Sequence, residues 1–392
     1  MRKKTFSFIL VSHNLFFFIF IMIPQTGYGT VFKYQYNAGS VIYVETNTFL
    51  VNRVDGKFNN ESHVKEISCI KVNSLKNNRA SLTAKTYILE RGKYSNKKYY
   101  KVRETRNFTY KKDVSGKTYG LDFVEGFHDF PLFSSRDIQP GDAWTAPAFY
   151  NNAFFRKYFP LKKLDTMVSY RYTGKDEKSG EILISANAVI THKNIFGAPL
   201  AKTGGYNNFL IRFNPLSGQC SSLEEVFDYF YLLSDLSILE TSGTSKTVIK
   251  ITGKPEEKVV SEIREDSSSN VEVNPDHSIS ITLENIRFKA NSSELMPESI
   301  KRLGKIAKIL LAYKKNPILI TGHTAAAGNP VAEQRLSEQR AKVVLEFLIL
   351  NYPLNPSLLS YRGKGSTDPA AGNTTEAGKA QNRRVEILIL PG

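Results

Sequence analysis

The pattern of apolar and polar residues changes once along the chain, near residue 252. Before that point, apolar side chains mostly recur at every second position, as in Val31–Tyr36. Period two, together with many Tyr, Phe and β-branched residues, is typical of half-buried strands, and turn signals such as Asp55-Gly56 separate the runs. We therefore predict an antiparallel all-β domain over residues 30–252, with one short helix at Leu223–Tyr231.

Two β architectures fit this region. A soluble sandwich or half-barrel exposes one face of each sheet to water. A small outer-membrane barrel instead needs strands of about ten residues, each with an uninterrupted row of apolar residues facing the lipid. Lys and Arg interrupt many of the candidate strands, as in Lys97–Arg103, and this favours the soluble architecture.

The first 29 residues have the pattern of a signal peptide. Basic residues at Arg2–Lys4 precede an apolar stretch from Phe6 to Ile23, and small residues at Gly27–Gly29 provide a cleavage site. An uncleaved membrane anchor is the alternative, because the stretch is nearly long enough to span a bilayer. We predict an exported protein, cleaved near Gly29 and without a lipid-modified N-terminal Cys.

The formal net charge of +16 suggests nucleic acid as a partner at first sight. The charge is spread thinly, however, with 16 Lys and Arg against 10 Asp and Glu in residues 276–392 and 34 against 27 in residues 30–275. Nucleic-acid binding proteins gather such charge into a stripe or patch. Diffuse charge on an exported protein fits anionic wall polymers or lipid headgroups better, and no nucleic-acid partner is predicted.

Two cysteines, Cys69 and Cys220, lie in the β-rich half. In an oxidising compartment they can form a disulfide, but free Cys is also a common buried residue. The sequence leaves both alternatives open, since it does not fix the distance between the two Cα atoms.

Residues 253–276 are polar, charged and poor in aromatic residues. This composition is typical of a flexible linker. We predict a flexible polar linker over residues 253–276, long enough to let the C-terminal region reach away from the β domain.

The last third of the chain alternates strand-like and helix-like patterns. Pro297 fits the first turn of a helix whose apolar stripe includes Leu303 and Leu310. The predicted order is strand, helix, strand, helix, strand, strand, which implies helices packed on one side of a mixed sheet. The predicted elements, besides the helix beginning at Pro297, are Ile279–Leu283, Ile318–Ile320, Val331–Leu350, Leu358–Tyr361 and Val385–Leu390.

Three motifs in this region give it a recognisable character. Thr321–Thr324 follows the second strand, Leu336-Ser337-x-x-Arg340-Ala341 lies on the second helix, and Asn382-Arg383-Arg384 precedes the last strand. In this order and spacing they resemble the OmpA-like C-terminal domain over about residues 277–391. The resemblance implies an α/β OmpA-like fold, here in residues 277–392, and non-covalent binding of peptidoglycan.

The resemblance also implies a ligand site. In the family, an Asp after the Gly-x-Thr turn and the Arg of the helix motif clamp the zwitterionic end of the diaminopimelate side chain. Arg340 matches that Arg, but Ala325 stands at the Asp position, and Glu333 stands where an Asn is common. Further candidate contacts to a stem peptide are Asn291, Thr324 and Arg383.

Three consequences of Ala325 are possible. Glu333 can supply the negative charge from a nearby point, the clamp can be tuned to another diamine, or the domain has lost peptidoglycan and kept its fold for another partner. A charge-assisted pair contributes about 1.5–3 kcal/mol, so its loss weakens binding roughly ten- to a hundred-fold. Weakened or altered binding is therefore the favoured expectation.

An enzyme is not predicted. Motifs such as His-Glu-x-x-His and Gly-x-Ser-x-Gly are missing from the sequence, and Glu125, His128 and Asp129 form the nearest acid–base group. His323 has no metal-like spacing to a second His or a Cys, so neither metal nor cofactor is expected. We predict a periplasmic envelope protein that tethers the outer membrane or an envelope partner of its β domain to peptidoglycan. The alternative is an OmpA-like scaffold that no longer binds the wall.

Overall fold

The computed structural model describes residues 31–91, 98–121, 126–151, 164–193, 200–255, 261, 270–283, 286, 288 and 293–392. The predicted signal peptide at residues 1–29 and the candidate residue Asn291 lie outside this part of the chain. Within the described ranges, no helix is long and apolar enough to cross a membrane.

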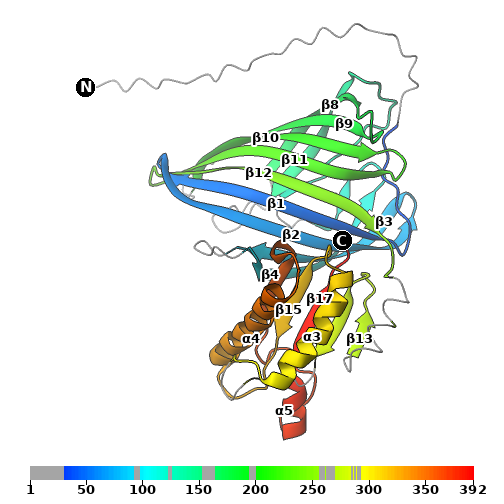
Figure 1. Ribbon diagram of the computed structural model, residues 1–392. Coiled ribbons are helices and arrows are strands. Elements are labelled where there is room, and N and C mark those ends of the chain that lie inside the picture. The colour runs from blue at the N-terminus through cyan, green and yellow to red at the C-terminus, as the bar shows by residue number, and fades with distance from the viewer. Residues whose placement is uncertain are drawn as a thin grey trace.

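The first half of the chain forms a curved antiparallel sheet (Figure 1). Neighbouring strands follow the order β6-β7-β8-β9-β10-β11-β12-β1-β2-β3-β4-β5, and β1 pairs with β12 from Val41 opposite Thr252 to Val54 opposite Leu239. The described residues of this region are thus β-rich, with antiparallel pairing between these strands. The strands are β1 Val41–Val54, β2 Lys57–Lys76, β3 Arg79–Glu90, β4 Tyr100–Asp113, β5 Thr118–Tyr119, β6 Gly126–His128, β7 Ala143–Asn151, β8 Leu164–Lys175, β9 Ile182–Lys193, β10 Leu200–Asn214, β11 Gln219–Leu233 and β12 Ile238–Thr252.

The turn between β1 and β2 is the one that Asp55-Gly56 predicts. Both residues have positive φ, 49° and 74°, which suits a two-residue hairpin between strands of right-handed twist. Two other expectations are wrong. Leu223–Tyr231 belongs to β11, because Phe227, Tyr229 and Tyr231 alternate into the core with period two. Val31–Tyr36 alternates in burial but joins no strand pair.

The core of this domain is rich in aromatic residues. Phe32 lies within 5.7 Å, between ring centroids, of Phe133, Tyr172 and Phe213. The single Trp, Trp144, is buried; its ring stacks on another aromatic ring and its indole N–H donates to a backbone carbonyl. The segment before β1 therefore contributes to the core through side chains rather than through a hydrogen-bonded ladder.

The two cysteines are free thiols in the core. Cys69 and Cys220 are both buried, and the Cys220 Sγ lies 3.5 Å from the Tyr34 hydroxyl. Of the two alternatives that the sequence leaves open, the structure has two separate buried thiols.

The C-terminal region forms a mixed sheet in the order β13-β14-β17-β15-β16, in which only β15 and β16 run parallel. The second predicted helix is confirmed as α4, and a short helix, α5, that the sequence analysis missed precedes the last strand. The elements are β13 Asn270–Val273, β14 Ile279–Leu283, α3 Pro297–Ala312, β15 Ile318–Gly322, α4 Pro330–Asn351, the 3₁₀ turn Pro356–Leu358, β16 Leu359–Gly363, α5 Glu376–Asn382 and β17 Val385–Ile389.

Each strand of this sheet sends alternate side chains to its two faces. Ile318 and Ile320 of β15 and Ile387 of β17 pack in one cluster with Leu303 of α3 and with Val344, Leu345 and Leu348 of α4. The predicted arrangement of α3 and α4 on one side of the sheet agrees with this packing. The opposite face carries Leu319, Leu388 and Leu390.

That opposite face is covered by the β domain. Leu319, Leu388 and Leu390 pack against residues of β1 to β4, and β16 pairs in parallel with β4 through Ser360 opposite Tyr100. Figure 1 shows the C-terminal region docked beside β2 and β4, with α4 next to β4. The β-domain residues in this cluster are Val41, Tyr43, Ile67, Cys69, Tyr87, Leu89, Tyr100 and Val102.

The docking corrects one expectation about the linker. A C-terminal region that shares a buried cluster with the β domain does not reach away from it, whatever the length of the connection. In addition, β13 lies inside the segment assigned to the linker and pairs with β14, so the C-terminal sheet begins earlier than predicted.

Candidate functional site

The loop that follows β15 is fixed by close backbone approach. A Cβ on Gly322 would lie 2.2 Å from the Ser337 carbonyl oxygen, so only glycine lets the end of β15 contact α4 here. Beyond it, the backbone N–H of His323 donates to Arg384 O and that of Thr324 donates to Gly365 O. The Gly-His-Thr motif is thus a rigid turn between α4, β17 and the loop after β16.

Glu333 holds the rest of this loop. Its carboxylate accepts hydrogen bonds from the backbone N–H groups of Ala327, at 2.6 Å, and Asn329, at 3.2 Å, and from the Ser366 hydroxyl. The hydroxyl bond first, and then the amide bonds, lower the pKa of Glu333. The carboxylate of Glu333 therefore holds the loop in place through these backbone N–H groups. A ligand contact of Glu333 stays a prediction.

Arg340 lies on the face of α4 that turns toward Phe288. Its guanidinium carbon is 4.8 Å from the centre of the Phe288 ring, a cation–π distance. Burial, and then the neighbouring guanidinium of Arg383, lower the pKa of Arg340. Arg383 in turn donates to Glu376 at the start of α5. Two of the predicted binding residues, Arg340 and Arg383, are thus brought close together by elements far apart in sequence.

The other predicted positions lie on the loop after β15. Thr324 is buried, and its hydroxyl has no hydrogen-bond partner among the described residues. Ala325 is half-buried, and its side chain has no polar group. Where the resemblance implies an Asp, this chain therefore has only the neighbouring hydroxyl of Thr324.

Asn382 is a structural residue that sequence reasoning did not identify. Its side-chain oxygen accepts from the N–H groups of Ala370 and Ala371, and its amide donates to Ala371 O and to Asn373 Oδ1. Asn373 in turn accepts from the Ala326 N–H, so Asn382 supports the loop that carries Ala325. Its place in the Asn-Arg-Arg motif was the available signal.

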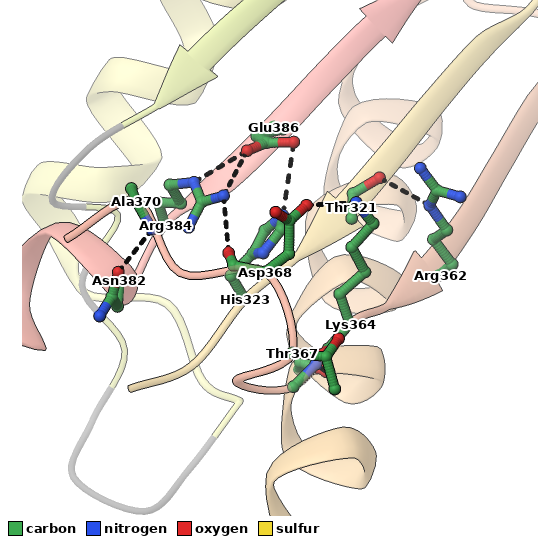
Figure 2. Close-up of polar contacts among 12 residues, drawn as sticks. Thr321, His323, Arg362, Lys364, Thr367, Asp368, Ala370, Asn382, Arg384 and Glu386 are labelled. Atoms are coloured by element: carbon green, nitrogen blue, oxygen red, sulfur yellow. Dashed lines mark hydrogen bonds and ion pairs between the residues drawn. The ribbon is translucent and has the colours of Figure 1, made fainter. Parts of the chain in front are cut away.

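Behind the turn, a buried polar network fixes His323 (Figure 2). Its Nε2 lies 3.4 Å from Glu386 Oε2, and Arg384 donates to Glu386 Oε1 and to Asp368 O. Burial raises the pKa of Glu386, but the contacts with His323 and Arg384 outweigh it and lower this pKa to about 2. His323 is thus buried in the fold, in agreement with its expected role as a structural turn residue.

The acid–base group suggested by the sequence is described only in part. Glu125 lies outside them. His128 is buried with its ring stacked 4.6 Å from Phe149, and Asp129 accepts hydrogen bonds from Thr118. Within the part of the chain that is described, no group of three or more His, Cys, Asp or Glu could hold a metal ion.

Comparison with known proteins decides the family of the C-terminal region. The model of the OmpA family matches residues 287–383, a range that contains the β15 turn, α4 and Arg383. Residues 287–383 are an OmpA family domain.

Three relatives illustrate this. The probable lipoprotein YiaD of Escherichia coli is 37% identical over 27% of this chain, and the outer-membrane lipoprotein YfiB of Pseudomonas aeruginosa is 36% identical over 26%. The peptidoglycan-binding protein ArfA of Mycobacterium bovis is 34% identical over 26%. The chain spans 48%, 61% and 32% of these relatives, respectively. Among solved structures, an outer membrane protein from Borrelia burgdorferi is 35% identical over 31% of this chain and 97% of its own, with a TM-score of 0.27.

Proposed function

We propose that this chain is a non-catalytic, exported envelope protein that holds its β domain to peptidoglycan through the OmpA domain. The observation that carries the proposal is the position of Arg340 on α4 against Phe288, within a domain whose relatives include proteins named for peptidoglycan binding. The protein would be periplasmic, next to the wall and the outer membrane, with an envelope protein or the membrane as the partner of the β domain.

The proposed binding residue is Arg340. A guanidinium binds a carboxylate through two parallel hydrogen bonds, and a second guanidinium nearby favours an anionic ligand further. Glu333 holds the loop after β15 through hydrogen bonds from Ala327, Asn329 and Ser366. We therefore expect Arg340 to bind a stem-peptide carboxylate, with Thr324, Arg383 and Asn291 as further contacts.

The absence of the Asp determines how strongly we expect this domain to bind peptidoglycan. With Ala325 at that position, an ammonium group of the peptide has no charged partner there, so recognition would be weaker or altered. Ala325 also supports the alternative, a scaffold that no longer binds peptidoglycan. Adding the carboxylate back is therefore the informative substitution.

The test is sedimentation of the full chain with peptidoglycan sacculi. Wild type, Arg340→Ala, Ala325→Asp and a control, Arg335→Ala on the exposed side of α4, are compared. We expect wild type and Arg335→Ala to pellet, Arg340→Ala to bind at least ten-fold more weakly, and Ala325→Asp to bind more tightly. A wild-type chain that stays in solution while Ala325→Asp pellets would establish the scaffold alternative.

A further inference from the structure

A second cleft lies on the seam between the two domains, away from the Arg340 groove. It has a volume of about 570 Å³ and is lined by β4 of the β domain and by α4, β16 and Lys364 of the OmpA domain. Gln334 and Glu338 are the α4 residues in its wall. At about 100° per residue, Arg340 lies roughly 200° around the helix from Glu338. The two sites are therefore on opposite sides of α4.

Arg362 forms part of the cleft wall. Its Nε donates to Thr321 Oγ1 at 3.2 Å, its Nη1 donates to Thr105 Oγ1 at 2.8 Å, and its guanidinium carbon lies 6.0 Å from the Tyr87 ring centre. Figure 2 shows the hydrogen bond between Arg362 and Thr321. Among the described residues, Arg362 forms no ion pair with a carboxylate.

Arg362 is half-buried in this position. Buried guanidinium groups in proteins are normally paired with an acid, because taking a charge out of water is costly. Burial lowers the pKa of Arg362, although the charges of Glu386 and Asp368 act on this pKa in the opposite direction. Two threonine hydroxyls supply hydrogen-bond acceptors but no negative charge.

Most of the other charged residues of the cleft wall are paired with one another or with a neighbour. Lys101 pairs with Glu338 across the seam at 2.7 Å, and Glu104 is gripped by the Arg106 guanidinium at 2.6 and 2.9 Å. Lys364 pairs with Asp368. Besides Arg362, two charged residues of the cleft lining remain outside these pairs. They are Arg103 and Glu90, and both are exposed. Two guanidinium groups thus share the cleft with one solvated carboxylate.

We propose that the seam cleft binds an oxyanion, either a carboxylate or a phosphate group, with Arg362 and Arg103 as its ligands. The planar guanidinium of Arg362, already oriented by Thr105 and Thr321, presents its remaining N–H groups to two oxygens at once. The site exists only when the OmpA domain is docked, because β4 supplies Arg103 and Thr105. It is independent of peptidoglycan binding at Arg340.

The experiment follows the Arg362 Nε–H signal of the full chain by ¹⁵N NMR, with Arg362→Lys used to assign it. Sodium phosphate and N-acetylmuramic acid, which carries a carboxylate, are titrated at constant ionic strength, with neutral N-acetylglucosamine as the blank. We expect a saturable shift with at least one anion and none with the blank. A response to phosphate alone or to N-acetylmuramic acid alone identifies the source of the oxyanion.

Variants keep the test specific. Arg103→Ala, an exposed position, should weaken the affinity about ten-fold, whereas Lys111→Ala, exposed further along β4, and Arg340→Ala should leave it unchanged. The proposal is overturned if neither anion gives a saturable shift, if Arg103→Ala behaves as Lys111→Ala does, or if Arg340→Ala abolishes the response. Because sedimentation with sacculi depends on Arg340, failure of one proposal leaves the other standing.

Discussion

The two faces of the C-terminal sheet are built in different ways. The face with Ile318, Ile320 and Ile387 is covered by α3 and α4, so it is completed inside the OmpA domain. The face with Leu319, Leu388 and Leu390 is covered by strands of the β domain, and Arg362 reaches Thr105 beside it. Packing on the first face completes the OmpA domain, whereas packing on the second face joins that domain to the β domain. Adjacent residues of β15 therefore have different roles: Ile318 and Ile320 stabilise the OmpA domain, and Leu319 stabilises its contact with the β domain.

The largest effect is expected on the helix-covered face. Ile320→Ala removes a fully buried side chain from the cluster with α3 and α4, and we expect a loss of about 4 kcal/mol in unfolding free energy. Urea denaturation followed by circular dichroism measures it. The control is Leu350→Ala, an exposed position of α4, which should change the free energy by less than about 0.5 kcal/mol.

Leu319→Ala tests the other face. It removes a side chain from the cluster shared with the β domain, and we expect a loss of about 3 kcal/mol together with easier separation of the two domains. Limited proteolysis between residues 253 and 270 should accelerate in Leu319→Ala but not in Leu350→Ala. Equal protection of the two variants would mean that the contact does not hold the domains together.

Glu386→Gln addresses the polar network behind the β15 turn. The folded pKa of Glu386, about 2, is below its unfolded value. Its contribution is therefore fully present above the unfolded pKa and is lost as pH falls from about 5 toward 2. Allowing for its exposed third, we expect Glu386→Gln to lower the stability by about 2 kcal/mol at pH 7. Unfolding from pH 7 to pH 2 should show a shallower slope in the variant; parallel slopes would contradict this assignment.

The smallest effect is expected for the Lys101–Glu338 ion pair across the seam. Its side chains are 49% and 29% exposed, and such pairs contribute about 0.5 kcal/mol. A double-mutant cycle with Lys101→Met and Glu338→Gln isolates the coupling, which should shrink further at high salt. A coupling above about 2 kcal/mol would show that polar contacts rather than Leu319 dominate the docking.

The helix-covered face was predictable from sequence and the docked face was not. Apolar stripes and motifs near Leu336 and Arg340 define α4 within a residue at each end. In contrast, Ile318–Ile320 is apolar at every position, and such a run is the same whether its second face meets a helix, a sheet or another domain. Pairing of β16 with β4 joins residues about 260 positions apart, which no local pattern encodes.

The candidate site, like the C-terminal sheet, could be predicted from the sequence only in part. Sequence motifs identified Arg340, Arg383 and the Ala325 position, because the spacing of these motifs can be recognised in a single sequence. The stacking of Arg340 on Phe288 and the use of Glu333 to hold the loop depend on which groups a folded backbone brings within 5 Å. The surroundings of Arg362 required the β domain to be in place, since Thr105 and Tyr87 belong to it.

The pairing of β16 with β4 also has a mechanical consequence. A chain held at α4 and pulled through its β domain would transmit the force across a shared sheet, before the segment between residues 253 and 270 came under tension. Sliding one strand past its neighbour breaks several hydrogen bonds and apolar contacts together, whereas a loose tether stretches at almost no load. Under load, the two docked domains should therefore behave as one stiff unit of fixed length until the contacts between them break.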